Sequence, residues 1–161
     1  MRIAKLKLRS ALETLRNASG KLTGGYYYTG PADFILREGR FFDPKSLPTR
    51  IISGEVRRCF LNARRVTRVH GFSYVEGYAL HANDIAILHA WNVDADGCVV
   101  DTTWIPSGKA YIGVAFPASV VTKWKGSLID NWENGWPLLQ KRLAMTARAE
   151  EYRGSKTHGI V

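Results

Sequence analysis

The hydrophobic and polar positions of the chain follow helical spacing in some segments and strand-like alternation in others. Residues 4–18 repeat leucines at helical intervals with basic side chains between them, which predicts an amphipathic helix ended by Gly20. The same spacing over residues 53–71 predicts a longer helix capped by Ser53 and ended by Gly71. The remaining predicted helices cover residues 31–38, 117–124 and 137–152, and the predicted strands cover residues 72–80, 85–93, 98–104 and 110–116.

These elements predict one α+β domain over residues 1–161, with an antiparallel sheet packed against the helix of residues 53–71 and with helices flanking it at both ends. Residues 40–49 contain two prolines and are expected to form an irregular surface loop, and the tail from about residue 153 is expected to be mobile. No apolar run approaches the roughly 18 residues of a membrane span. The basic start of the chain lacks the apolar middle of a signal peptide, so we expect a cytoplasmic protein.

Residues 85–104 hold two β-rich runs around a glycine-containing turn, which is typical of a β-hairpin. If residues 95–97 form a three-residue loop with its glycine at positive φ, Trp91 pairs with Asp101. In that register Asp101 lies diagonal to His89 on the same face, within reach of a side-chain hydrogen bond. A loop of two or four residues would place these two side chains on opposite faces.

An imidazole oriented by a carboxylate supplies two parts of a nucleophilic site, and Cys59 would supply the third from a separate element. The apolar stripe of its helix contains Cys59, so the thiol is expected to face the sheet. Cys98 begins an apolar strand and is interpreted as a small buried hydrophobic residue. His81 competes with His89 as a base, but it lies in a predicted turn. Asn62, one turn after Cys59, could orient the helix end or a substrate amide, but it is interpreted as an ordinary residue of the helix surface.

The motifs Val75-Glu76-Gly77-Tyr78-Ala79, His89-Ala90-Trp91 and Asp101-Thr102-Thr103 follow the helix that carries Cys59. With this order of motifs the chain resembles the transglutaminase-like branch of the papain-like superfamily. The likeness covers Cys59 to Trp104, less than a third of the chain. Thr102 stands where that family usually has a proline, which is expected to alter the backbone after Asp101. The resemblance implies a papain/transglutaminase-like fold with Cys59 as nucleophile, His89 as base and Asp101 as the orienting acid.

The resemblance further implies a cysteine-dependent acyl-transfer enzyme that hydrolyses or transamidates an amide-containing protein, peptide or small molecule, with no cofactor and no metal. Glu76, Tyr78 and Trp91 adjoin the motifs and are predicted to contact substrate. A tyrosine-bonded or surface role for Glu76 is equally compatible with the sequence. The aromatic and glycine-rich segment of residues 23–30 fits either a substrate-facing loop or an edge strand.

The net charge of +9 predicts attraction to an acidic partner or to nucleic acid. The segment of residues 53–71 carries five arginines and only one acidic residue, Glu55. The arginines are Arg57, Arg58, Arg64, Arg65 and Arg68. They fit a phosphate-binding stripe or a solvated helix face. The alternative function is therefore a basic nucleic-acid-binding or interaction module on a catalytically inactive papain-like scaffold. A zinc site has suitable ligand types in Cys59, His89, Asp101 and Cys98, but no closely spaced ligand pair.

Overall fold

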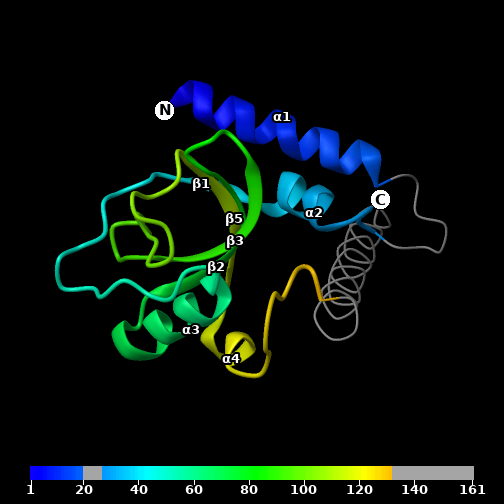
Figure 1. Ribbon diagram of the computed structural model, residues 1–161. Coiled ribbons are helices and arrows are strands. Elements are labelled where there is room, and N and C mark those ends of the chain that lie inside the picture. Colours follow the sequence, from blue (N-terminus) through cyan, green and yellow to red (C-terminus); the bar gives the residue numbers. More distant parts are fainter. Residues whose placement is uncertain (20–26, 132–161) are drawn as a thin grey trace, which may run out of the picture.

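The computed structural model describes residues 1–19 and 27–131, which form an antiparallel sheet with helices around it (Figure 1). The helices are α1 (Arg2–Ala18), α2 (Pro31–Glu38), α3 (Cys59–His70) and α4 (Ala118–Val121). The strands are β1 (Arg40–Phe42), β2 (Ser73–Leu80), β3 (Ala86–Val93), β4 (Val99–Val100) and β5 (Ala110–Phe116). The predicted final helix at 137–152 and the tail from about 153 lie outside the described residues.

The sheet has the strand order β1-β5-β2-β3-β4, and neighbouring strands run antiparallel. The predicted α+β class with an antiparallel sheet is confirmed. The predicted irregular loop at residues 40–49 is wrong at its start, because Arg40–Phe42 pairs with residues 111–113 of β5 as an edge strand. The predicted strand at residues 98–104 is shorter, since β4 ends at Val100.

The sheet curls, and its two faces bury different sets of side chains. One face carries Tyr74 and Leu80 of β2 into a core shared with the helices. The inside of the curl holds Trp91 of β3 and Tyr111 of β5. Trp91 fits there because β5 has a glycine opposite it: a Cβ on Gly113 would lie only 2.6 Å from the indole ring. The curl therefore closes around aromatic rings that come from strands on either side of β2.

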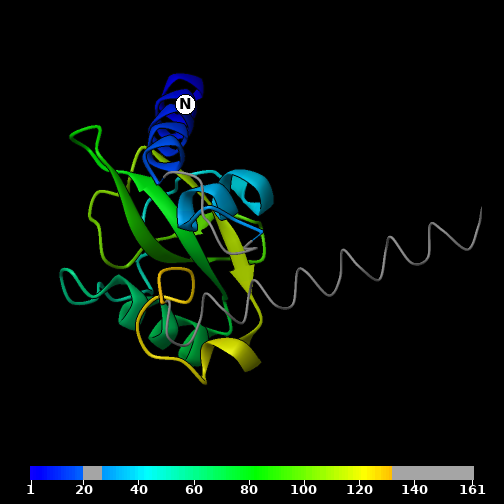
Figure 2. The same ribbon diagram turned by 90° about the vertical axis from the view of Figure 1, so that its right-hand side faces the viewer.

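The first helix packs against the sheet through one apolar stripe, as predicted for residues 4–18. Leu8 and Leu12 are fully buried. Figures 1 and 2 show α1 at one end of the sheet and α3 and α4 at the other. No helix within residues 1–19 and 27–131 is long and apolar enough to cross a membrane.

The helix that carries the cysteine begins later than predicted. It starts at Cys59 and not at Ser53, because the preceding turn leaves helical geometry: Arg57 has a left-handed φ of 65°. The side chain of Asn62 holds that turn in place, since its Oδ1 accepts a hydrogen bond from the Glu55 amide (3.2 Å) and its Nδ2 donates to the Glu55 carbonyl (2.7 Å). Cys59 consequently occupies the first turn of α3, where the helix dipole acts most strongly.

Candidate active site

The hairpin of β3 and β4 brings His89 and Asp101 together in the register that a three-residue loop predicts. Gly97 has a φ of 79°, and Asn92 and Val93 pair with Val100 and Val99. Asp101 follows β4 directly, and its Oδ2 lies 2.8 Å from Nε2 of His89. Both side chains are almost fully buried. Two groups that lie twelve positions apart in the sequence thus form a buried imidazole–carboxylate pair.

Hydrogen bonds to both oxygens hold the Asp101 carboxylate in one orientation. Oδ1 accepts from the backbone amides of Thr103 (2.8 Å) and Trp104 (3.1 Å). Oδ2 accepts from the Tyr111 hydroxyl at 2.8 Å as well as from His89. Burial by itself would raise the pKa of Asp101, but the hydrogen bond and charge of His89, together with the other donors, lower it below its usual value. The acid is therefore ionised at neutral pH.

The imidazole of His89 is held between its acid and two indole rings. It stacks on Trp104 with ring centroids 4.0 Å apart and planes 16° apart, and the Trp91 ring lies nearly parallel to it at 6.3 Å. Burial alone would lower the pKa of His89; hydrogen bonding to Asp101, and then to Cys59, outweighs it and raises the pKa to about 9. The folded chain consequently favours imidazolium at neutral pH.

Cys59 approaches the imidazole from the start of α3. Its side chain is buried, and its hydrogen bonding and charge both act on the pKa of His89. β4 pairs only with Asn92 and Val93, so the part of β3 that carries His89 has no strand on its β4 edge. The helix α3, which begins with Cys59, packs against β3. The bond from Nε2 to Asp101 leaves Nδ1 as the nitrogen that can face the sulfur. Cys59 is therefore near enough to His89 to act on its pKa, while Asp101 holds Nε2 of the same ring.

Asn62 is buried and connects the parts of the site, so its interpretation as a surface residue is wrong. Its Nδ2 donates to Thr103 Oγ1 at 2.9 Å in addition to the bonds with Glu55. It therefore joins the helix of Cys59 to the loop whose amides orient Asp101. Its position one turn after Cys59 in the sequence could have indicated this buried role.

Thr102, the residue that departs from the resembled family, is buried, and its carbonyl accepts a hydrogen bond from the Gly54 amide at 2.7 Å.

The residues predicted to contact substrate do not share one environment. Glu76 is fully buried, and its carboxylate accepts from the hydroxyl of Tyr74 (2.5 Å) and from the backbone amide of Leu128 (2.7 Å). Burial raises the pKa of Glu76, and these donors only partly offset it. Tyr78 is half-buried, and burial together with the charge of Asp130 raises its pKa to about 12. Trp91 alone of the three makes a ring contact with the imidazole of His89 in the described part of the chain.

The remaining candidates have partners other than His89 and Asp101 or are partly exposed. His81 bonds to Asn83, and the ring of Trp104 contacts both histidine rings. Cys98 is half-buried, so it is more accessible than its interpretation as a buried residue implied. Of residues 23–30 the structure describes 27–30, which form bends and no strand, and Tyr28 is buried and donates to Glu38 at 2.8 Å.

The arginine-rich side of α3 is partly occupied by internal contacts. Arg64 donates to the carbonyls of Val121 and Gly126, and its guanidinium lies 5.3 Å from the centre of the Tyr74 ring. Arg58 forms an ion pair with Glu55 at 3.1 Å. Arg64 therefore connects α3 to α4 and to the loop that follows it, and Arg58 pairs within the turn that precedes α3.

Tyr111 was not identified from the sequence, and its role can be tested by removing one oxygen. Its hydroxyl donates to Asp101 and accepts from the Gly108 amide at 2.6 Å. We expect Tyr111→Phe to lower the free energy of unfolding at pH 7 by about 1–3 kcal/mol, because a buried amide loses its partner and Asp101 loses a donor. Urea denaturation measures the change. Tyr78→Phe, at a half-buried tyrosine of the neighbouring strand, is the control and should change it by less than about 0.5 kcal/mol. Equal losses in both variants would contradict the role given to Tyr111.

No protein-family model, curated protein or solved structure matches the chain. The described residues also contain no group of three or more histidine, cysteine or acidic side chains placed to hold a metal ion. The geometry of Cys59, His89 and Asp101 therefore carries the functional argument.

Proposed function

We propose that this protein is a cysteine-dependent acyl-transfer enzyme with Cys59 as nucleophile, His89 as base and Asp101 as the orienting acid. The observation that carries the proposal is the buried series of side chains: Asp101 holds Nε2 of His89 at 2.8 Å, while Cys59 acts on the same imidazole. Core packing alone does not call for a carboxylate with donors on both oxygens or for an imidazole stacked on an indole. A catalytic base, in contrast, needs a fixed orientation of this kind.

In the proposed reaction the sulfur of Cys59 attacks the carbonyl carbon of an amide while its proton resides on Nδ1 of His89. The tetrahedral intermediate collapses when the imidazolium gives that proton to the leaving amine, and a thioester remains on Cys59. Water or a second amine then attacks the thioester, with His89 accepting its proton, and the thiol is released. Asp101 stays ionised throughout and stabilises the imidazolium. Hydrolysis and transamidation use the same residues and differ in the attacking nucleophile.

The start of α3 supports the same chemistry. The amides of the first helical turn have no partner within the helix, and the dipole of α3 places partial positive charge beside Cys59. This end of the helix is suited to negative charge on the sulfur, and the Cys59 amide is suited to an oxyanion formed next to it.

The proposal is tested by trapping the acyl-enzyme. A Cys98→Ser protein, which retains one thiol, is mixed with p-nitrophenyl acetate and quenched in acid. Intact-mass and peptide analysis should show one acetyl group on Cys59, removable by hydroxylamine as a thioester is. Cys59→Ala in the same background is the control and should remain unmodified. A folded Cys98→Ser protein that forms no adduct at Cys59, or forms it equally fast after unfolding in urea, would remove the basis of the proposal.

A further inference from the structure

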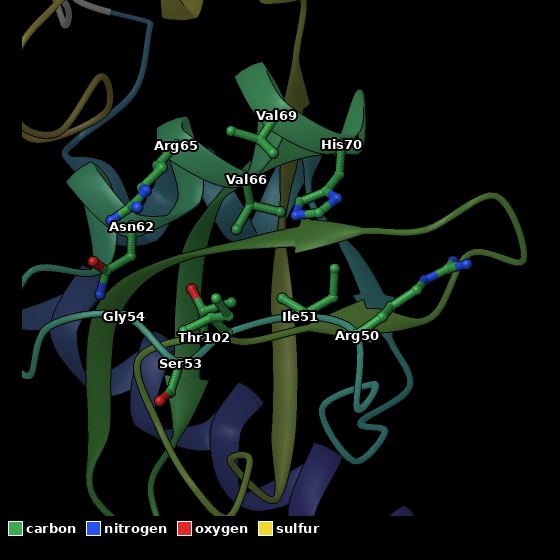
Figure 3. Close-up of a pocket in the computed structure, with 11 residues that line it drawn as sticks. Arg50, Ile51, Ser53, Gly54, Asn62, Arg65, Val66, Val69, His70 and Thr102 are labelled. Atoms are coloured by element: carbon green, nitrogen blue, oxygen red, sulfur yellow. The ribbon is translucent and has the colours of Figure 1, made fainter.

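A pocket of about 240 Å³ lies between residues 50–54 and α3, and it contains neither Cys59 nor His89 (Figure 3). Figure 3 shows Ile51 and Val66 facing each other across it. Both side chains are buried, which gives the pocket an apolar interior. At about 30 Å³ per water, the volume corresponds to about eight water molecules, so a small molecule fits and a folded partner does not.

The pocket is a preformed part of the fold and not a gap between loose segments. One end is closed by Asn62 and Gly54, which lie so close that a Cβ on Gly54 would come within 2.3 Å of the Asn62 side chain. The Gly54 amide also bonds to the carbonyl of Thr102, a buried residue that lines the same pocket. These contacts fix the distance between the loop and the helix. An occupant would therefore find the cavity already formed.

The rim of the pocket combines exposed apolar side chains with positive charge. Ile52 and Val69 line it while 87% and 61% exposed, respectively. Arg50 and Arg65 line it as well, and neither forms an ion pair with any residue among 1–19 and 27–131. His70 lies on the Arg50 side of the pocket in Figure 3.

The charges around this pocket are of one sign. None of the residues that line it is acidic, while two are arginines and one is a histidine. Guanidinium groups bind carboxylates through paired hydrogen bonds, and an apolar interior favours a hydrocarbon chain. A ligand with only one of these properties would leave either the arginines unpaired or the exposed Ile52 and Val69 uncovered.

We propose that this pocket binds a small amphipathic carboxylate, with its hydrocarbon chain between Ile51 and Val66 and its carboxylate at Arg50 or Arg65. The pocket contains none of Cys59, His89 and Asp101, although Asn62 and Thr102 belong to the walls of both sites, and its occupation does not rest on the acyl-transfer proposal. Its occupant is a free medium-chain carboxylate, because a pocket of about 240 Å³ admits a chain of that size and the rim supplies the cations.

The experiment is calorimetric titration of the full chain with octanoate, with octylammonium and octanol as ligands that keep the chain and change the head group. Octanoate should bind saturably and at least about tenfold more tightly than either. The double variant Arg50→Glu, Arg65→Glu should lose that preference. Arg68→Glu, at an exposed arginine of α3 that does not line the pocket, should retain it.

A second pair of variants tests the apolar part. Val69→Asn should weaken octanoate binding by about threefold or more, while Leu61→Asn, at an exposed apolar residue of α3 outside this pocket, should leave it unchanged. Cys59→Ala should bind octanoate as the unmodified chain does, so the outcome is independent of catalysis. Absent binding, equal binding of octanoate and octylammonium, or an equal loss in Arg68→Glu would overturn the proposal.

Discussion

Replacing His89 with alanine should slow the alkylation of Cys59 by iodoacetamide at pH 7 by about a hundredfold. A positioned base contributes at least about this factor to proton transfer from a nucleophile. Without the imidazole, the buried sulfur loses the group that holds its proton in the proposed reaction. The rate is measured by mass spectrometry in a Cys98→Ser background, so that the half-buried second thiol does not contribute.

The matched control for this experiment is His81→Ala. His81 also contacts the ring of Trp104, but its Nδ1 bonds to Asn83 in a surface turn. It should leave the rate of Cys59 alkylation within about twofold of its starting value, since it takes no part in the series of Cys59, His89 and Asp101. Asp101→Asn, which keeps the size of the side chain, should give an intermediate loss. Alkylation at an undiminished rate in folded His89→Ala would show that the imidazole does not activate the thiol.

The second large effect is a loss of stability at alkaline pH that depends on His89. The pKa of this imidazole is raised from 6.5 to about 9 in the folded chain, so folding favours its protonated form. The resulting stabilisation is complete below about pH 6.5 and is lost as the pH rises through about 9. At about 1.4 kcal/mol for each unit of pKa, the loss amounts to about 3 kcal/mol at most. His89 is almost fully buried, so solvent screening removes little of it.

This loss is measured by urea denaturation at a series of pH values from about 6 to 10. His89→Gln removes the titrating group and serves as the reference, because the other ionisable groups contribute equally to both proteins. The difference in unfolding free energy between the two should shrink as the pH rises. A constant difference over this range would mean that folding does not raise the pKa of His89. In acid the sign is reversed for Asp101, whose lowered pKa adds stability that disappears as the carboxylate becomes protonated.

The pairing of His89 with Asp101 could be predicted from the sequence because it depends on local rules. Strand alternation places His89, and a three-residue loop ending in Gly97 sets the register that brings Asp101 to the same face. Neither step requires knowledge of the rest of the fold. The placement of Cys59 at the start of its helix was not predictable in this way. Its spacing with Val56 suggested continuous helix, whereas Val56 is exposed and Arg57 adopts a left-handed φ.

The parts that sequence reasoning missed depend on contacts between distant elements. Asn62 is unremarkable within its helix, and its role comes from Glu55 and from Thr103 on another loop. Tyr111 reaches Asp101 only because β5 pairs with β2 and closes the curl of the sheet. The buried carboxylate of Glu76 likewise receives its donors from residues 127–129. Such partners follow from strand order, which a single sequence does not specify.

The stacking of Trp104 on His89 gives the protein an intrinsic optical reporter. An imidazolium in contact with an indole quenches its fluorescence more strongly than a neutral imidazole does, and these two ring centres are 4.0 Å apart. Because the His81 ring also contacts Trp104, the emission of Trp104 follows the proton on His89 in a His81→Ala background, without an added dye or a bound substrate. The ionisation of the site is in this way readable in the intact protein.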